Sequence, residues 1–214
     1  MTTNDILISV EGLKKYIPED KLWPVNDIYD LHFTRNPYDG TGTTFVEQQI
    51  EASGILFGEA ENLNDFVKKS MALHSEFVKA DSEFHRARKA TCGGAMFWMF
   101  SDIWPSGTWA IVDYYLIPKA SYYSAKRSYA AITPIITKIK GKTALYVVND
   151  TLNGLKGELS LRYTDISGNL SLEKKFPVID TMQLARNFYH EELKFFNLKS
   201  LARYFKIQQE HHHL

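Results

Sequence analysis

The sequence contains one cysteine, Cys92, so no disulfide can form within the chain. It has no apolar run close to the roughly 20 residues that a helix needs to cross a bilayer. It also has no excess of charge, because 25 basic residues balance 25 acidic ones. Net charge therefore gives no argument for nucleic acid or an anionic membrane surface as a partner.

Two further motifs are missing. The sequence has no Cys and His cluster at zinc-ligand spacing and no strand-to-helix glycine loop for phosphate, so it predicts neither a metal nor a cofactor.

Its N-terminus has no basic segment followed by an apolar stretch, and the chain is therefore expected to be cytoplasmic; a secreted or periplasmic parent protein stays open. Cys92 lies in an apolar context and is expected to be a small buried side chain rather than a reactive thiol. His211 to His213 resemble a tag or a tail.

Helical periodicity is strongest over residues 63–90, where an apolar stripe follows the capping candidates Asn62 and Asn64. Short helices are expected over residues 10–16 and 118–131, the latter with Pro118 in its first turn. Residues 20–58 contain two prolines and four glycines, which favours an irregular stretch with short helices.

Strand patterns appear later in the chain. The apolar run Ala95 to Phe100 is typical of a strand that is buried on both faces, and a polar, turn-rich loop follows it. After Pro134 the hydrophobic period changes to two, and about four short strands are predicted up to Val178. Residues 181–207 look helical or irregular rather than stranded. The order predicts an α/β part followed by part of a β-sandwich.

Aromatic residues make up 14% of the sequence, and many of them lie between Phe97 and Tyr129. Such a cluster is either ordinary core or a sugar site, because flat rings complement the apolar faces of pyranoses. Three stretches in this region resemble glycoside hydrolase family 2, above all its β-mannosidases, with exo-β-glucosaminidases second. They are Gly94 to Pro105, Thr108-Trp109, and Asp113 to Arg127.

The resemblance covers roughly residues 9–165 and implies a fold. Residues 1–132 would be the C-terminal part of a (β/α)8 TIM barrel, with residues 95–102 as its last strand. Residues 133–207 would be part of an immunoglobulin-like β-sandwich, and residues 208–214 a tail or tag. An incomplete barrel has two unpaired strand edges, which predicts self-association or a rearranged fold.

The resemblance also implies a retaining mechanism, with two carboxylates about 5 Å apart acting as acid/base and nucleophile. The family's nucleophile motif, of the type Ser-Glu-Phe-Gly, does not occur in this sequence. Glu11 lies near the expected place, but its neighbours match the helix that follows that motif, so we expect a solvated glutamate at a helix start. No catalytic residue is assigned, and the chain alone is expected to be inactive.

Four residues are predicted to bind substrate: Trp98, Asp102, Trp104 and His32. By resemblance Trp98 forms the floor of the sugar site, although from sequence alone a core tryptophan is favoured. Asp102 fits a sugar-hydroxyl contact and a loop-capping role equally well. Trp104 is expected to wall the entrance or to pack under Pro105. His32 reaches the sugar or, slightly favoured, has a structural role.

The parent protein is thus expected to hydrolyse terminal β-mannosides, with carbohydrate as its partner and neither nucleic acid nor membrane. Met99 and Ser101 replace the Gln and Asn common in the family, which weakens the assignment of substrate contacts there. A β-galactosidase-like or exo-β-glucosaminidase fragment remains an alternative. So does a non-catalytic carbohydrate-binding or interaction module.

Overall fold

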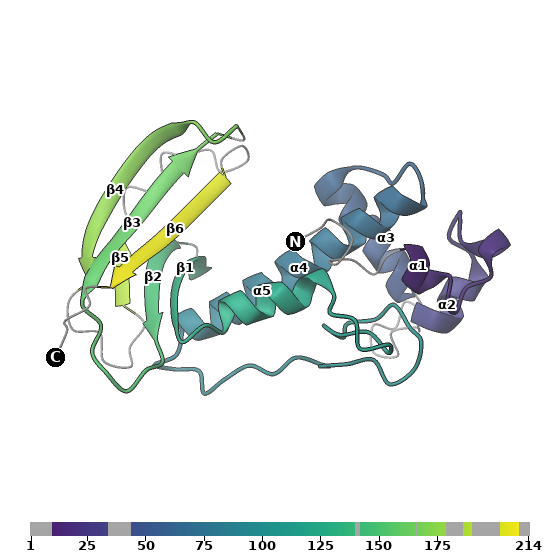
Figure 1. Cartoon of the computed structure of the whole chain (residues 1–214), viewed down its shortest axis with the longest axis horizontal. Helices are drawn as coiled ribbons and strands as arrows, with labels where there is room; N and C mark the ends of the chain where they lie inside the picture. The colour runs from purple at the N-terminus through teal and green to yellow at the C-terminus, as the bar shows by residue number, and fades with distance from the viewer. Residues whose placement is uncertain are drawn as a thin grey trace. The chain divides into compact units, whose positions relative to one another are not determined.

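The computed structural model describes residues 10–33, 44–139, 142–165, 167–178, 186–189 and 202–209. The chain divides into two compact units (Figure 1). The first unit comprises residues 1–79 and 96–127, and the second comprises residues 80–95 and 128–214. This division falls within the longest helix. The domain boundary predicted at residue 132 stays a prediction.

The first unit is mainly helical. Its elements are α1 (Val10–Leu13), the 3-10 helix η1 (Glu19–Lys21), α2 (Asp27–Phe33), α3 (Phe45–Phe57), most of α4 (Leu63–Ala87) and α5 (Ala120–Ser128). Helix α4 confirms the strongest predicted helix, although it ends three residues early. The side chain of Asn62 accepts a hydrogen bond from the amide of Asp65, as predicted for a capping residue. Helix α5 starts two residues after Pro118.

Short helices were expected within residues 20–58, and η1 and α2 fit that expectation, whereas α3 is longer, with 13 residues. Thr44 and Glu47 form a reciprocal capping box at its N-terminus, in which the Glu47 carboxylate accepts from the Thr44 amide at 2.7 Å. The helix ends at Gly58, whose φ of 81° lies in the left-handed region. These two signals explain why the helix extends over 13 residues despite the glycine content of the stretch.

One apolar cluster holds the helices of the first unit together. Tyr29 is fully buried at its centre, and its hydroxyl donates to the carbonyl of Leu22 at 2.6 Å. Burial of each large apolar side chain contributes about 1.5–3 kcal/mol. The cluster consists of Leu13, Ile17, Leu22, Tyr29, Phe33, Val46, Phe66, Val67 and Met71.

The segment from Ala95 to Phe100 is extended, but it is neither a regular strand nor buried on both faces, so that part of the prediction is wrong. Side chains alternate along it: Met96, Trp98 and Phe100 are exposed, whereas Phe97 packs on a cluster that includes Val78. A strand requires hydrogen-bonded neighbours. Among the described residues, this stretch up to Ser101 has only one isolated bridge, from Ser101 to Val112.

The described residues of the second unit form two antiparallel sheets of three strands each (Figure 1). Strand β2 (Lys142–Asn149) pairs with β1 (Ile132–Ile139) and with β5 (Arg186–Tyr189). Strand β3 (Gly157–Thr164) pairs with β4 (Leu170–Val178) and with β6 (Ala202–Gln209). The four predicted strands are confirmed. Strands β5 and β6 correct the prediction that residues 181–207 are helical or irregular.

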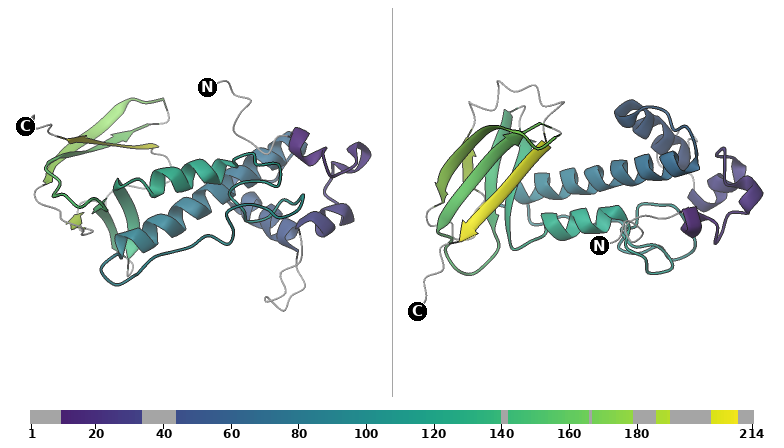
Figure 2. Two further views of the ribbon diagram at one scale, coloured as in Figure 1. Left: turned by 60° about the horizontal axis from the view of Figure 1, so that its bottom comes forward. Right: turned by 45° about the horizontal axis from the view of Figure 1, so that its top comes forward.

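Both sheets of this unit contribute to one core, and Figure 2 shows them as separate layers. Leu145 and Val147 come from β2, and Leu159, Leu161 and Tyr163 come from β3. The opposite face of the β1–β2 pair covers Ala87 at the end of α4. Strand β2 is therefore buried on both faces, which explains its continuous apolar sequence.

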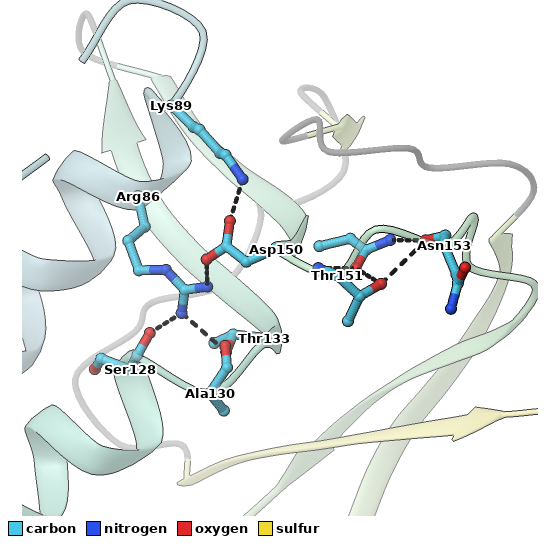
Figure 3. A network of polar contacts seen from close by, with 9 residues as sticks. Arg86, Lys89, Ser128, Ala130, Thr133, Asp150, Thr151 and Asn153 are labelled. Atoms are coloured by element: carbon cyan, nitrogen blue, oxygen red, sulfur yellow. Dashed lines mark hydrogen bonds and ion pairs between the residues drawn. The ribbon is translucent and has the colours of Figure 1, made fainter. Parts of the chain in front are cut away.

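Arg86 and Asp150 form the centre of a polar network in the second unit (Figure 3). The Arg86 guanidinium lies 2.5 Å from the Asp150 carboxylate, donates to Thr133 at 3.1 Å and also bonds the carbonyl of Ser128. Lys89 pairs with the second carboxylate oxygen of Asp150. Burial alone would raise the pKa of Asp150, but the hydrogen bonds from Lys89 and Arg86 hold it below its usual value.

No helix in the described part of the chain is long and apolar enough to cross a membrane. The predicted tail, residues 208–214, lies almost entirely outside the described residues. Cys92 is partly exposed rather than buried, and its thiol donates to the carbonyl of Gly94 at 3.4 Å.

Candidate functional site

The loop from Ser101 to Trp109 carries two of the predicted site residues, Asp102 and Trp104. Inside the loop, the Asp102 carboxylate accepts hydrogen bonds from the ammonium of Lys119 at 2.7 Å, from Thr108 at 2.7 Å and from Ser106 at 3.2 Å. The side chains of Asp102 and Lys119 are both fully excluded from solvent. This ion pair therefore fixes the loop from within.

Lys119 is positioned to join both ends of the loop. Besides Asp102, its ammonium donates to the carbonyl of Thr108 at 3.0 Å. Burial lowers the pKa of Lys119, and the negative charge of Asp102 opposes that change. Because a buried charge without a partner is costly, each member of the pair requires the other.

On the outer side of the same loop, the indole of Trp104 stacks on the imidazole of His32. The ring centroids are 5.2 Å apart and the planes are inclined by 19°. His32 Nδ1 lies 2.8 Å from the carbonyl oxygen of Pro105. Because a carbonyl can only accept, Nδ1 carries the proton in this bond. The amide of Gly107 donates to the carbonyl of His32, which ties the loop to α2.

Gly107 allows this close approach of the loop to α2. A Cβ atom at position 107 would lie 2.0 Å from the ring of Phe33, which is itself buried in the core. Only glycine fits at this point without displacing that ring. Tyr16 completes the surroundings, with its ring centroid 4.8 Å from that of His32.

Trp98 lies apart from these residues, on the extended segment that leads into the loop. Its side chain is 84% exposed, and the peptide bond between Trp98 and Met99 is cis. The structure thus brings Asp102, Trp104 and His32 together through one loop, and it leaves the indole of Trp98 open to solvent. Substrate binding by these four residues stays a prediction.

The carboxylates near the loop are occupied by other contacts. Asp102 is held by Lys119, and Asp113 accepts from the amide of Ile117 at 2.8 Å while being buried. Glu11 lies in the first turn of α1, is 74% exposed and pairs with Lys14. The interpretation of Glu11 as a solvated glutamate at a helix start is confirmed. In the described ranges, no group of three or more His, Cys, Asp or Glu could hold a metal ion.

Sequence reasoning missed Lys119, Ser106, Thr108 and Tyr16. Lys119 follows Pro118 in an apolar stretch, which is a weak signal for a buried lysine. Burial raises the pKa of the Tyr16 phenol, with further contributions from Asp102 and Tyr29. Trp109, at the end of the loop, packs edge-to-face on Phe45, with the ring centroids 4.5 Å apart.

No family model matches the sequence. A β-mannosidase B of Emericella nidulans is 30% identical over 171 residues, which are 71% of this chain and 19% of that protein. A β-mannosidase B of Aspergillus clavatus is 29% identical over 194 residues, which are 82% of this chain and 21% of that protein. The chain spans about a fifth of the length of these curated relatives.

Two solved structures share the fold. A β-D-mannosidase from Dictyoglomus thermophilum superposes with a TM-score of 0.73 at 23% identity, over 96% of this chain and 24% of that one. An exo-chitosanase from Amycolatopsis orientalis superposes with a TM-score of 0.69 at 18% identity, over 96% of this chain and 26% of that one.

Proposed function

Because this chain belongs with the β-mannosidase-like enzymes of glycoside hydrolase family 2, we propose that it forms part of a retaining exo-β-glycosidase. The substrate class we propose is a terminal β-mannoside. In this proposal the chain supplies an aromatic wall of the sugar site and does not hydrolyse glycosides by itself. The remaining walls, the acid/base and the nucleophile belong to the rest of the parent protein.

The observation that carries the proposal is the stack of Trp104 on His32 above a fixed loop. Rings held by packing can meet a pyranose without losing conformational freedom on binding. The buried ion pair of Asp102 and Lys119 holds the loop in place, and Gly107 lets the loop lie close to the ring of Phe33. We propose Trp98 as a second stacking surface, because its indole is exposed on the adjoining segment.

Asp102 has a different role in this proposal from a direct sugar contact. Its side chain is fully buried, and both carboxylate oxygens accept hydrogen bonds from side chains of the chain itself. A carboxylate so engaged is a positioning group for the loop. This supports the loop-capping alternative that the sequence left open.

The proposed lack of activity follows from chemistry. Retaining hydrolysis requires an acid that protonates the leaving oxygen and a carboxylate that attacks the anomeric carbon. Asp102 and Asp113 lie near the aromatic residues, yet both are buried and bonded within the chain. Neither can reach a bound sugar in this arrangement.

The test is to assay and titrate the purified chain. We expect no turnover of p-nitrophenyl β-mannoside and measurable calorimetric binding of methyl β-mannoside. Trp104→Ala should lose that binding. Trp23→Phe is the matched control, because the indole of Trp23 packs on Phe66, whereas that of Trp104 stacks on His32. Clear turnover by the chain would overturn the proposed inactivity, and absence of heat with any sugar would overturn the sugar-site proposal.

The same titration separates the alternatives. Stronger binding of methyl β-glucosaminide would favour the exo-β-glucosaminidase class, and stronger binding of methyl β-galactoside the β-galactosidase class. Binding by the chain and absence of β-mannosidase activity in the parent protein would favour a non-catalytic carbohydrate-binding module.

A further inference from the structure

A pocket lies in the first unit, next to the loop from Ser101 to Trp109. Helices α3 and α4 form its sides, and Thr108 and Trp109 close one end. Its volume is about 200 Å³. For comparison, an apolar cavity of about 150 Å³ can hold a benzene molecule.

The walls of this pocket are mostly apolar and partly aromatic. Phe45 and Phe77 contribute rings, Ala52 and Leu73 contribute aliphatic surface, and Trp109 meets Phe45 edge-to-face. Flat walls of this kind pack best against a flat, apolar guest, because aromatic pairs gain energy beyond the burial of area.

One polar group in the pocket wall lacks a partner. The hydroxyl of Ser70 is buried, and no hydrogen bond to it is found among the described residues. A buried hydroxyl without a partner costs free energy, which a ligand that bonds to it would recover. Ser70 lines this pocket from α4, and a change of its χ1 rotamer would turn the hydroxyl towards a ligand there.

The pocket carries no charge. None of its lining side chains is Asp, Glu, Lys or Arg. Burial, followed by the nearby Lys119, lowers the pKa of His74 to about 4, so its imidazole is neutral at physiological pH. A charged ligand would lose its hydration here without finding a counter-ion.

We propose that this pocket binds a small, neutral aromatic alcohol, with its ring between Phe45 and Leu73 and its hydroxyl bonded to Ser70. This site is separate from the proposed sugar surface and does not depend on it. It adjoins the same loop, because Thr108 lines the pocket and donates to Asp102 at 2.7 Å. Occupancy therefore also stabilises the loop.

The test uses three probes of similar size: phenol, toluene and benzoate, titrated into the whole chain by ligand-observed NMR. Phenol binds, toluene binds more weakly by about fivefold because it lacks the hydrogen bond, and benzoate does not bind. Phenol also raises the thermal unfolding midpoint.

Two variants locate the binding. Ser70→Ala lowers the affinity for phenol about fivefold and leaves toluene unchanged. Ser53→Ala is the matched control, since its buried hydroxyl already donates to the carbonyl of Ile50 and lies outside the pocket. Ala52→Leu fills the pocket and abolishes binding of both probes.

If benzoate binds as tightly as phenol, the proposal is overturned. The same holds if neither phenol nor toluene binds at concentrations up to the solubility limit of toluene. Equal loss of phenol affinity in Ser70→Ala and Ser53→Ala would also overturn it. If circular dichroism shows that Ala52→Leu does not fold, the comparison of the two serine variants still decides.

Discussion

The ammonium of Lys119 lies 2.7 Å from the carboxylate of Asp102, and both side chains are completely hidden from solvent. The two residues are 17 positions apart in the sequence and bracket the loop that carries Trp104. A buried ion pair adds little net stability compared with apolar residues of similar size. Removing one partner is nevertheless costly, because it leaves the other charge buried without a counter-ion.

The first prediction concerns this pair. Lys119→Met leaves the Asp102 carboxylate buried without its counter-ion and should lower the free energy of unfolding by about 3–5 kcal/mol. The double variant Lys119→Met with Asp102→Asn removes both charges and should recover most of the loss. Urea unfolding followed by tryptophan fluorescence measures both. A single-variant cost below about 1 kcal/mol would contradict the ion-pair interpretation.

The second prediction concerns Gly107. Gly107→Ala forces a methyl group against the buried ring of Phe33 and should cost about 1–3 kcal/mol. Gly93→Ala is the matched control, because nothing lies within 4 Å of a Cβ built at that position. Thermal unfolding compares the two variants. Equal midpoints would show that the loop does not lie against α2 as described.

The third prediction concerns pH. Burial lowers the pKa of His74 from 6.5 to about 4, so the folded chain resists protonation that the unfolded chain accepts. The contribution of neutral His74 to the free energy of unfolding, up to about 3 kcal/mol, is complete above pH 6.5. It is lost as the pH falls towards 4. His74→Gln should flatten this part of the stability profile. Parallel profiles for His74→Gln and the wild type would refute the assignment.

The fourth prediction concerns the second unit. Arg86 is 9% exposed and bonds Ser128, Thr133 and Asp150, whereas Lys89 is 34% exposed and pairs with Asp150. Arg86→Ala should therefore lower the free energy of unfolding by about 2–3 kcal/mol, and Lys89→Ala by less than about 1 kcal/mol. Chemical denaturation monitored by far-ultraviolet circular dichroism distinguishes them. The reverse order would place the centre of the network at Lys89.

The parts of the fold that sequence predicts are those with strong local signals. Helix α4 combines a long apolar stripe with a cap at Asn62. Strands β1, β3 and β4 show hydrophobic alternation, and β2 is a continuous apolar run that ends at a turn. Helix α3 is longer than the short helices expected there, because the capping box of Thr44 and Glu47 fixes its start and its glycines do not interrupt it before Gly58. The run at Ala95 to Phe100 was misinterpreted because burial depends on neighbouring segments, which a local pattern does not contain.

The candidate site shows the same limit. The residues that resemble a known family placed Asp102 and Trp104 on one loop, and the structure adds His32 beside them. No spacing rule predicts that a lysine next to Pro118 is buried against an aspartate on another segment. Pairing of that kind is set by tertiary packing, and it decides whether Asp102 faces outward or inward.

The hydrogen bond from His32 to Pro105 fixes more than the loop. Because Nδ1–H donates to a carbonyl, this tautomer of the ring carries a lone pair on Nε2, at its other edge. That edge can accept a hydrogen bond from a hydroxyl and cannot donate one. The imidazole therefore selects for a group that donates a hydrogen bond.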